Sequence, residues 1–481
     1  MFKFYYLIEI FILLGIFFIC CCCILINKKK TSFKFSQIVG CAVLFFSFIF
    51  NLYYFFNFEN SSFFLSNIFF NSQHGVILLR SFFLFFGFVS IVTLPFLGVD
   101  KQWEIIVIIL TLIFGFSILL TTNNLVYIFL CFEIISICIY ILIFMQSYKR
   151  KLVDSGLEYF ILSALSNLFF LFGVSLIFVF YPTIFLEEIQ FLILSNIFVS
   201  PFFVFSVTFL LIMFGFKFGI IPFYNWLPAL YDGFSFFTLI FLMVPLKIIY
   251  FIVFIKLITG AFVSFFFFFS PIFFLFGFST LIIGIFGALY ATKMKVLFGY
   301  ASMFHSGVLL LLLSIFGTEV NFFLMIYLII YGSITLVVFV FFCFLFARTF
   351  DQNFIYNFES FLLNNPRMSW FFFLVLFGIA GLPPLLGFLM KINVILSFIK
   401  NGYICITVFF ISISTISNYY YLKVIKYQKF NGYLTSINYK ESYSFRLAWF
   451  FFFFFLILLV GMFEPTFFFL ICNIVFKSFI N

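Results

Sequence analysis

The sequence predicts an all-α polytopic membrane protein with about 14 transmembrane helices, arranged as two inverted five-helix repeats with broken helices 7 and 12. Of the 481 residues, 66% are hydrophobic and 8% are charged, whereas a soluble domain has roughly 45–50% apolar and about 25% charged residues. Apolar stretches close to the ~20 residues that cross a bilayer recur along the chain. Glycine and proline interrupt two of these stretches beside lysines. This composition excludes a soluble globular protein and a disordered one.

Residues 1–100 form an N-terminal segment with three predicted spans, at 4–26, 35–56 and 76–98. The first stretch is long, apolar and not Arg-rich, so we expect a retained span and not a transit peptide. Its Cys20–Cys23 run and the histidines His74 and His305 do not have metal-ligand spacing. The sequence therefore predicts no metal site, no cofactor-binding site and no redox centre in this chain.

Residues 101–260 form the first predicted repeat. Its five spans are expected at 104–122, 124–146, 157–181, 201–224 and 234–257. Lys217 lies between Gly215 and Gly219, shortly before Pro222. Proline removes a helical hydrogen bond and glycine loosens the backbone, so we expect the seventh span to break there.

Residues 261–425 form the second predicted repeat, and residues 426–481 form a predicted loop and a C-terminal span. The spans are expected at 272–290, 295–316, 319–347, 369–397, 402–424 and 447–475. Lys391 follows Gly381, Pro383, Pro384 and Gly387 in the twelfth span. Two interrupted spans at equivalent positions are typical of inverted-repeat transporters, and an odd number of spans in each repeat gives the repeats opposite orientations.

Basic residues are unequally divided between the two sets of loops. The loops after odd-numbered spans hold 17 of the 25 Lys and Arg residues: Lys28, Lys29, Lys30, Lys34, Lys101, Lys149, Arg150, Lys151, Lys293, Lys295, Arg348, Arg367, Lys423, Lys426, Lys429, Lys440 and Arg446. The opposite side holds Lys3, Lys256, Lys400 and Lys477. The positive-inside rule then places both termini outside. Topology thus accounts for the net charge of +10 without a nucleic-acid partner.

Several charged residues remain inside predicted spans, where each costs roughly 2.5–3.5 kcal/mol. Arg80 and Lys256 lie near span ends, so we expect them to extend to the interface. Glu133 lies too deep for its short side chain to reach water. Together with Lys217, Lys247 and Lys391 it is a candidate for an ion pathway or proton relay, although a purely structural role is the alternative.

Polar groups on three helices could extend such a relay. Glu133, Ser136 and Tyr140 share one helix face by their spacing. Ser302 and His305 share a second face, and Tyr327, Tyr331 and Thr335 share a third. From these groups we take Tyr140, His305 and Tyr331 as auxiliary relay candidates. Ordinary interhelical hydrogen bonding is the alternative.

Residues 100–425 resemble subunit 2 of respiratory complex I, the proton-pumping NADH:ubiquinone oxidoreductase. The resemblance is carried by N-L-V-Y-I-F-L-C-F-E (124–133), L-E-Y-F (157–160), F-K-F-G-I-I-P-F-Y-N-W-L-P-A-L-Y-D-G (216–233), V-P-L-K (244–247), T-K-M-K-V-L-F-G-Y-A-S-M-F-H-S-G (292–307) and G-I-A-G-L-P-P-L-L-G-F-L-M-K (378–391). Single blocks are also shared with the other antiporter-like subunits and with Mrp-type antiporters.

The resemblance implies a role for each buried residue. Glu133 and Lys217 would be the acid–lysine pair of an entry half-channel, Lys247 the central relay lysine, and Lys391 the exit-side residue. Burial favours a neutral lysine and a nearby carboxylate favours a charged one. Weakening the Glu133–Lys217 pair would therefore release a proton toward Lys247. The family usually has His where Tyr224 stands, an acid at Ala229 and often Lys at Glu158, so the role of the loop after span 7 is open.

The resemblance also implies a setting. FMN, iron–sulfur clusters and ubiquinone would belong to partner subunits, which include the other antiporter-like and small hydrophobic membrane-arm subunits, with lipids around them. The location would be the mitochondrial inner membrane, with both termini on the intermembrane-space side. The alternatives are a stand-alone or Mrp-type cation/proton antiporter, an assembly subunit that does not pump, and a photosynthetic homologue.

Overall fold

The computed structural model describes residues 7–26, 29–57, 73–94, 103–145, 150–195, 201–315, 317–346 and 366–430. In these residues the secondary structure is helical apart from one isolated bridge between Asn124 and Phe185. Eleven helices are long and apolar enough to cross a membrane, and Phe202–Phe218 and Trp370–Ala380 are shorter apolar helices. The polytopic all-α prediction is confirmed. The last predicted span, 447–475, lies outside the described residues.

Two compact units divide the described chain. The first unit holds the residues up to Phe218 together with Gly233–Phe267, and the second holds Gly219–Asp232 and the described residues from Phe268 onward. The repeat limits predicted from the sequence, 101–260 and 261–425, stay a prediction.

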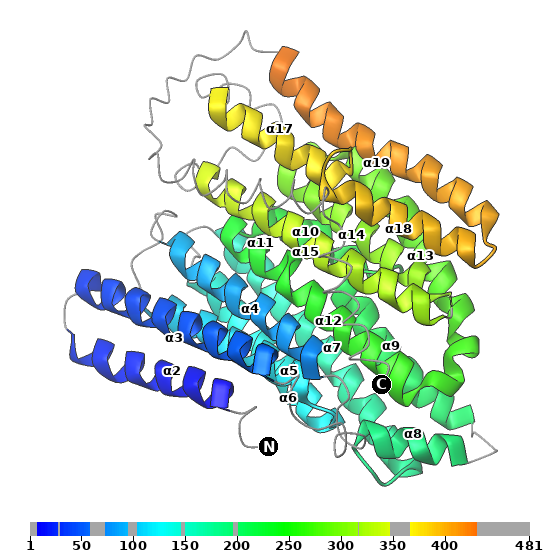
Figure 1. Cartoon of the computed structure of the whole chain (residues 1–481), viewed down its shortest axis with the longest axis horizontal. Helices are drawn as coiled ribbons and strands as arrows, with labels where there is room; N and C mark the ends of the chain where they lie inside the picture. Colours follow the sequence, from blue (N-terminus) through cyan, green and yellow to red (C-terminus); the bar gives the residue numbers. More distant parts are fainter. Residues whose placement is uncertain are drawn as a thin grey trace. The chain divides into compact units, whose positions relative to one another are not determined.

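The first unit is a bundle of apolar helices (Figure 1). Its helices are α2 (Leu7–Leu25), α3 (Lys29–Asn57), α4 (Gln73–Thr93), α5 (Glu104–Thr121), α6 (Leu125–Phe144), α7 (Arg150–Phe180), α8 (Leu186–Ser195), α9 (Pro201–Phe218), α11 (Phe236–Met243) and α12 (Pro245–Lys256). Helix α7 packs along α9. A Cβ atom at Gly173 would lie 3.0 Å from the carbonyl oxygen of Ser206, so the small residue permits this close approach.

The sequence did not predict two features of this unit. Helix α8 is a short helix between the sixth and seventh spans. The eighth span is divided into α11 and α12 at Val244, because Pro245 cannot donate a hydrogen bond into the preceding turn and instead begins a new helix. A five-residue π-helix, Leu257–Ala261, and a short 3₁₀-helix, Val263–Phe265, follow α12.

The second unit contains the remaining described helices (Figure 1). These are α10 (Trp226–Gly233), α13 (Phe266–Tyr290), α14 (Met294–Leu313), α15 (Thr318–Phe346), α17 (Pro366–Ala380), α18 (Leu386–Lys400) and α19 (Ile404–Phe430). Helix α13 begins at Phe266, six residues before the predicted limit of 272. Within this unit α15 packs against α17 and α18, and α19 against both of the latter.

Both predicted helix breaks are present, and they share one backbone pattern. After α9 ends at Phe218, Gly219 has a φ of 66° and the Ile221–Pro222 peptide is cis. After α17 ends at Ala380, Gly381 has a φ of 72° and the Pro383–Pro384 peptide is cis. Positive φ is the region that glycine tolerates best. Both helices therefore break at the glycine and proline residues where the sequence predicts it.

Candidate proton-relay site

Glu133 lies in the middle of α6 and is half-buried. The helix begins at Asn124, whose side chain accepts a hydrogen bond from the backbone N–H of Val126, a typical N-cap. One turn onward, the hydroxyl of Ser136 donates to the Glu133 carbonyl and lies 3.4 Å from the amide nitrogen of Asn167. The sequence analysis missed Asn167, although an amide in an apolar span is itself a signal.

Lys217 is the penultimate residue of α9. Its Nζ atom is shielded from solvent and has no hydrogen-bond partner among the described residues. It lies 5.4 Å from the ring centroid of Tyr250, a cation–π distance. The Glu133 carboxylate acts on Lys217 electrostatically. The expected Glu133–Lys217 pair is therefore a through-space interaction and not a hydrogen-bonded salt bridge.

Lys247 lies in the first turn of α12, directly after the Val244–Pro245 division. It is 4% exposed. Tyr250, which the sequence analysis did not select, follows three residues later and is 3% exposed. A spacing of three residues places both side chains on one helix face. The first unit thus brings Glu133, Lys217 and Tyr250 near one another, and Lys247 lies one helical turn from Tyr250.

Lys391, in the second unit, has a well-defined set of neutral partners. Its Nζ donates to the carbonyl oxygen of Ala380 at 2.6 Å and to Oδ1 of Asn418 at 2.6 Å. Weaker contacts reach the carbonyl of Ser414 at 3.4 Å and the hydroxyl of Ser417 at 3.3 Å. Ala380 is the last residue of α17, so the break supplies a carbonyl that has no partner within its own helix. Sequence reasoning missed Asn418 and Ser417.

His305 also lies in the second unit, on α14, and contacts two tyrosines of α15. Its Nδ1 atom is 2.7 Å from the hydroxyl of Tyr327, and its ring centroid is 4.6 Å from that of Tyr331. The hydrogen-bonded tyrosine is therefore Tyr327 and not Tyr331.

In the first unit, the ring of Tyr140 packs 4.9 Å from Phe144 and 4.8 Å from Phe160.

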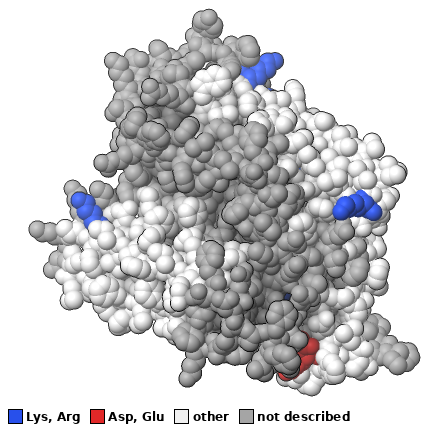
Figure 2. Space-filling view, viewed as in Figure 1, with Lys and Arg blue, Asp and Glu red and all other residues white. Residues whose placement is uncertain are grey.

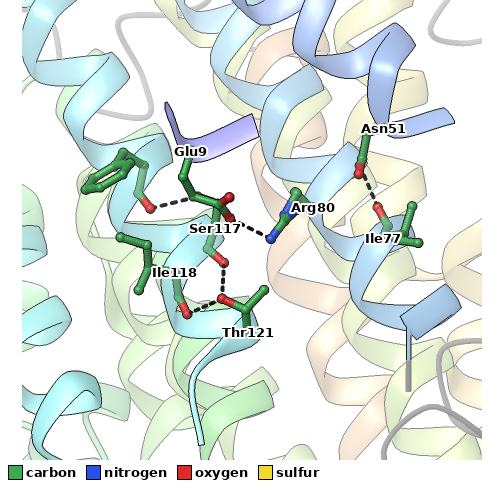
Figure 3. A network of polar contacts seen from close by, with 8 residues as sticks. Glu9, Asn51, Ile77, Arg80, Ser117, Ile118 and Thr121 are labelled. Atoms are coloured by element: carbon green, nitrogen blue, oxygen red, sulfur yellow. Dashed lines mark hydrogen bonds and ion pairs between the residues drawn. The ribbon is translucent and has the colours of Figure 1, made fainter. Parts of the chain in front are cut away.

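The structure corrects the prediction for Arg80, which does not extend to the interface. It is 1% exposed, and its Nη2 atom is 2.6 Å from Oε1 of Glu9 on α2. Figure 3 shows this ion pair, together with the separate hydrogen bonds of Ser117 and Thr121 within α5. The Asn51 side chain donates to the Ile77 carbonyl at 2.8 Å. Sequence reasoning missed Glu9 because it lies close to the start of the first span.

Two other lysines lie at helix ends. Lys256, the last residue of α12, donates to the Thr122 carbonyl at 2.6 Å. Glu187 of α8, nearby, accepts a hydrogen bond from Asn123 at 2.9 Å, and partial burial raises the pKa of its carboxyl group above the ordinary value. Lys295 is buried in the first turn of α14, although the sequence placed it in a basic loop. Among the described residues visible in Figure 2, Lys and Arg side chains lie at scattered positions.

Comparison with known proteins gives the family of this chain. Residues 122–417 match the family described as NADH:quinone oxidoreductase/Mrp antiporter, transmembrane region. The chain belongs to this antiporter family. It is 32% identical over 331 residues to NADH-quinone oxidoreductase subunit N of Wolbachia sp. subsp. Brugia malayi, covering 68% of this chain and 69% of that protein. Subunit N of Pelagibacter ubique is 30% identical over 345 residues, covering 71% and 72%.

Solved structures share the fold of this chain. A chain of respiratory complex I from Thermus thermophilus has a TM-score of 0.77 at 18% identity, covering 95% of this chain and 97% of that one. A chain of the Mrp complex from Dietzia sp. has a TM-score of 0.84 at 13% identity, covering 100% and 98%. The prediction that this chain is related to antiporter-like subunits of complex I is confirmed at the family level. The similar sequences are bacterial subunits N, so they do not establish the mitochondrial subunit 2 expected above.

Proposed function

We propose that this chain is a proton-translocating, antiporter-like membrane-arm subunit of an NADH:quinone oxidoreductase, of the subunit N or subunit 2 type. The proton passes along a relay of four residues: Glu133, Lys217, Lys247 and Lys391. Redox chemistry in partner subunits supplies the energy for this transfer. FMN, iron–sulfur clusters and ubiquinone belong to those partners. The proposed location is the mitochondrial inner membrane.

The observation that carries this proposal is the environment of two buried lysines. Lys217 Nζ has no hydrogen-bond partner among the described residues, and Lys391 Nζ donates to carbonyl, hydroxyl and amide oxygens, which are all neutral. A lysine that only stabilised the fold would be expected to pair closely with a carboxylate, because an isolated buried charge is costly. Among the described residues neither ammonium group is hydrogen-bonded to a carboxylate that would hold its proton in place. These two lysines are therefore suited to proton exchange.

The test is proton translocation per NADH oxidised by the assembled complex in reconstituted membranes. Lys217→Ala, Lys247→Ala and Lys391→Ala should each lower this ratio while flavin and iron–sulfur signals stay at the parent level. Lys151→Ala, at an exposed position in the first turn of α7, is the matched control and should keep the parent ratio. Parent ratios in all three buried-lysine variants would exclude the relay.

An Mrp-type cation/proton antiporter subunit is the second candidate. The TM-score of 0.84 to a chain of the Mrp complex favours it as a fold. It predicts Na⁺/H⁺ exchange in vesicles without NADH. Exchange that depends on NADH oxidation, or no exchange, would exclude it.

A further inference from the structure

Tyr250 is close to one lysine of the first unit and lies one helical turn from the other. Lys217 Nζ of α9 is 5.4 Å from the centre of its ring. Lys247 precedes it by three residues on α12, which places both side chains on one face of that helix. Tyr250 therefore contacts Lys217 across the packing of α9 and α12, and shares a helix face with Lys247.

Within the part of the chain that the structure describes, the hydroxyl group of Tyr250 lacks the hydrogen-bond partner that a buried polar group usually has. It is buried and has no hydrogen-bond partner among the described residues. The ring packs 5.3 Å from Phe132, the neighbour of Glu133. Glu133 and the buried Tyr159 act on the hydroxyl electrostatically. A buried polar group without a partner costs about 1–3 kcal/mol, and Phe would fill an apolar contact of this kind without that cost.

Two polar atoms without partners thus share one buried region: Lys217 Nζ and Tyr250 Oη. A water molecule can bridge two polar groups that are not directly hydrogen-bonded. A phenol can take part because its oxygen both accepts and donates a proton. The Glu133 carboxylate acts electrostatically on Lys217 and on Tyr250, and Tyr159 acts on Tyr250.

We propose that Tyr250 passes the proton from Lys217 to Lys247. This inference rests on the proposed function. The Lys217 ammonium gives one proton to a water molecule, which gives one to Tyr250 Oη. The original phenolic proton leaves Oη and forms an N–H bond with the neutral Lys247 amine. One O–H bond forms on Tyr250 and one breaks, so the phenol ends neutral, Lys217 is an amine and Lys247 is an ammonium.

Tyr250→Phe tests this step because it removes one oxygen atom and keeps the ring. Proton translocation per NADH should fall to the value of Lys247→Ala, while complex assembly and NADH oxidation are retained. Tyr181→Phe is the matched control: Tyr181 is also buried in the first unit, with its ring 5.1 Å from Phe203. It should keep the parent ratio.

Two further variants separate proton passage from packing. Tyr250→His changes the shape of the side chain but can accept and donate a proton, so it should pump above the Tyr250→Phe level. Tyr250→Trp carries a larger ring that donates but does not accept a hydrogen bond, so it should pump at the Lys247→Ala level. A parent ratio in Tyr250→Phe or Tyr250→Trp, beside lost pumping in Lys217→Ala and Lys247→Ala, would overturn the role of Tyr250 alone. Parent ratios in the lysine variants would instead overturn the proposed function.

Discussion

The buried basic residues of this chain have different partners, and those partners separate their roles. Arg80 forms a short ion pair with Glu9. Lys391 is surrounded by neutral oxygens, two of them at 2.6 Å. Lys217 lies over an aromatic ring without a hydrogen bond among the described residues. Arginine remains protonated in proteins whereas lysine can change its charge, so the ion pair is suited to structure and the lysines to proton exchange.

Lys217→Arg distinguishes a residue that releases a proton from one that only supplies positive charge. The guanidinium group keeps its proton at any accessible pH, so we expect pumping as low as in Lys217→Ala. The ratio of protons moved to NADH oxidised measures this, with the flavin signal reporting assembly. A parent ratio in Lys217→Arg would mean that Lys217 does not need to release a proton.

At the scale of elements, the helix breaks set the environment of the lysines. At the second break, Lys391 donates to the carbonyl that ends α17, and its stem passes close to Gly381. The division of the eighth span at Pro245 places Lys247 in a first turn, where proline is well tolerated.

Gly381→Ala should disturb both the backbone and Lys391. The added Cβ would lie 2.8 Å from Lys391 Cε, at a φ of 72°. Gly402→Ala is the matched control, since Gly402 has a φ of 79° but no atom within 4 Å of an added Cβ. The control should show only the left-handed backbone cost of about 1–2 kcal/mol. We therefore expect a lower thermal dissociation midpoint and weaker pumping in Gly381→Ala. Equal effects in the two variants would contradict the close packing over Lys391.

The Glu9–Arg80 pair joins helices α2 and α4, so its loss should destabilise the packing between these two helices. Arg80→Met leaves a buried carboxylate without its cation, which typically costs about 3–5 kcal/mol. The double variant Glu9→Met/Arg80→Met leaves no unpaired charge and should be more stable than Arg80→Met alone. Thermal unfolding of the four forms gives the coupling between the two sites. Additive destabilisation would show that the pair does not stabilise this contact.

At the scale of the whole molecule, the loop charges predict the orientation in the membrane. Lys149, Arg150 and Lys151 should be cleaved by a Lys/Arg-specific protease only from the matrix side. Glu187 and Glu188, exposed on α8, follow the next span and should be cleaved by a Glu-specific protease only from the opposite side. Immunoblotting of intact and inverted membranes measures both cleavages. The reverse pattern would invert the topology.

Fold class and the candidate lysines were both predictable from the sequence. Apolar stretches longer than a span and sparse charges leave few alternatives to transmembrane helices, because backbone groups in lipid must be bonded internally. The helix breaks at Gly219 and Gly381 could be predicted because glycine and proline act on the backbone locally. The same local rule applies to Pro245, but its break was missed because the surrounding stretch remains apolar throughout.

Contacts between helices distant in sequence were decided only by the tertiary structure. The sequence by itself determined that Arg80, Lys217 and Lys391 lie within apolar spans. It could not show that Arg80 meets Glu9, that Lys391 meets Asn418, or that Lys217 lies over Tyr250. Helical periodicity gives the face of a side chain but not the helix that this face meets. The partner of each buried charge therefore depends on helix packing, and the partner determines whether that charge is held fixed or is able to exchange its proton.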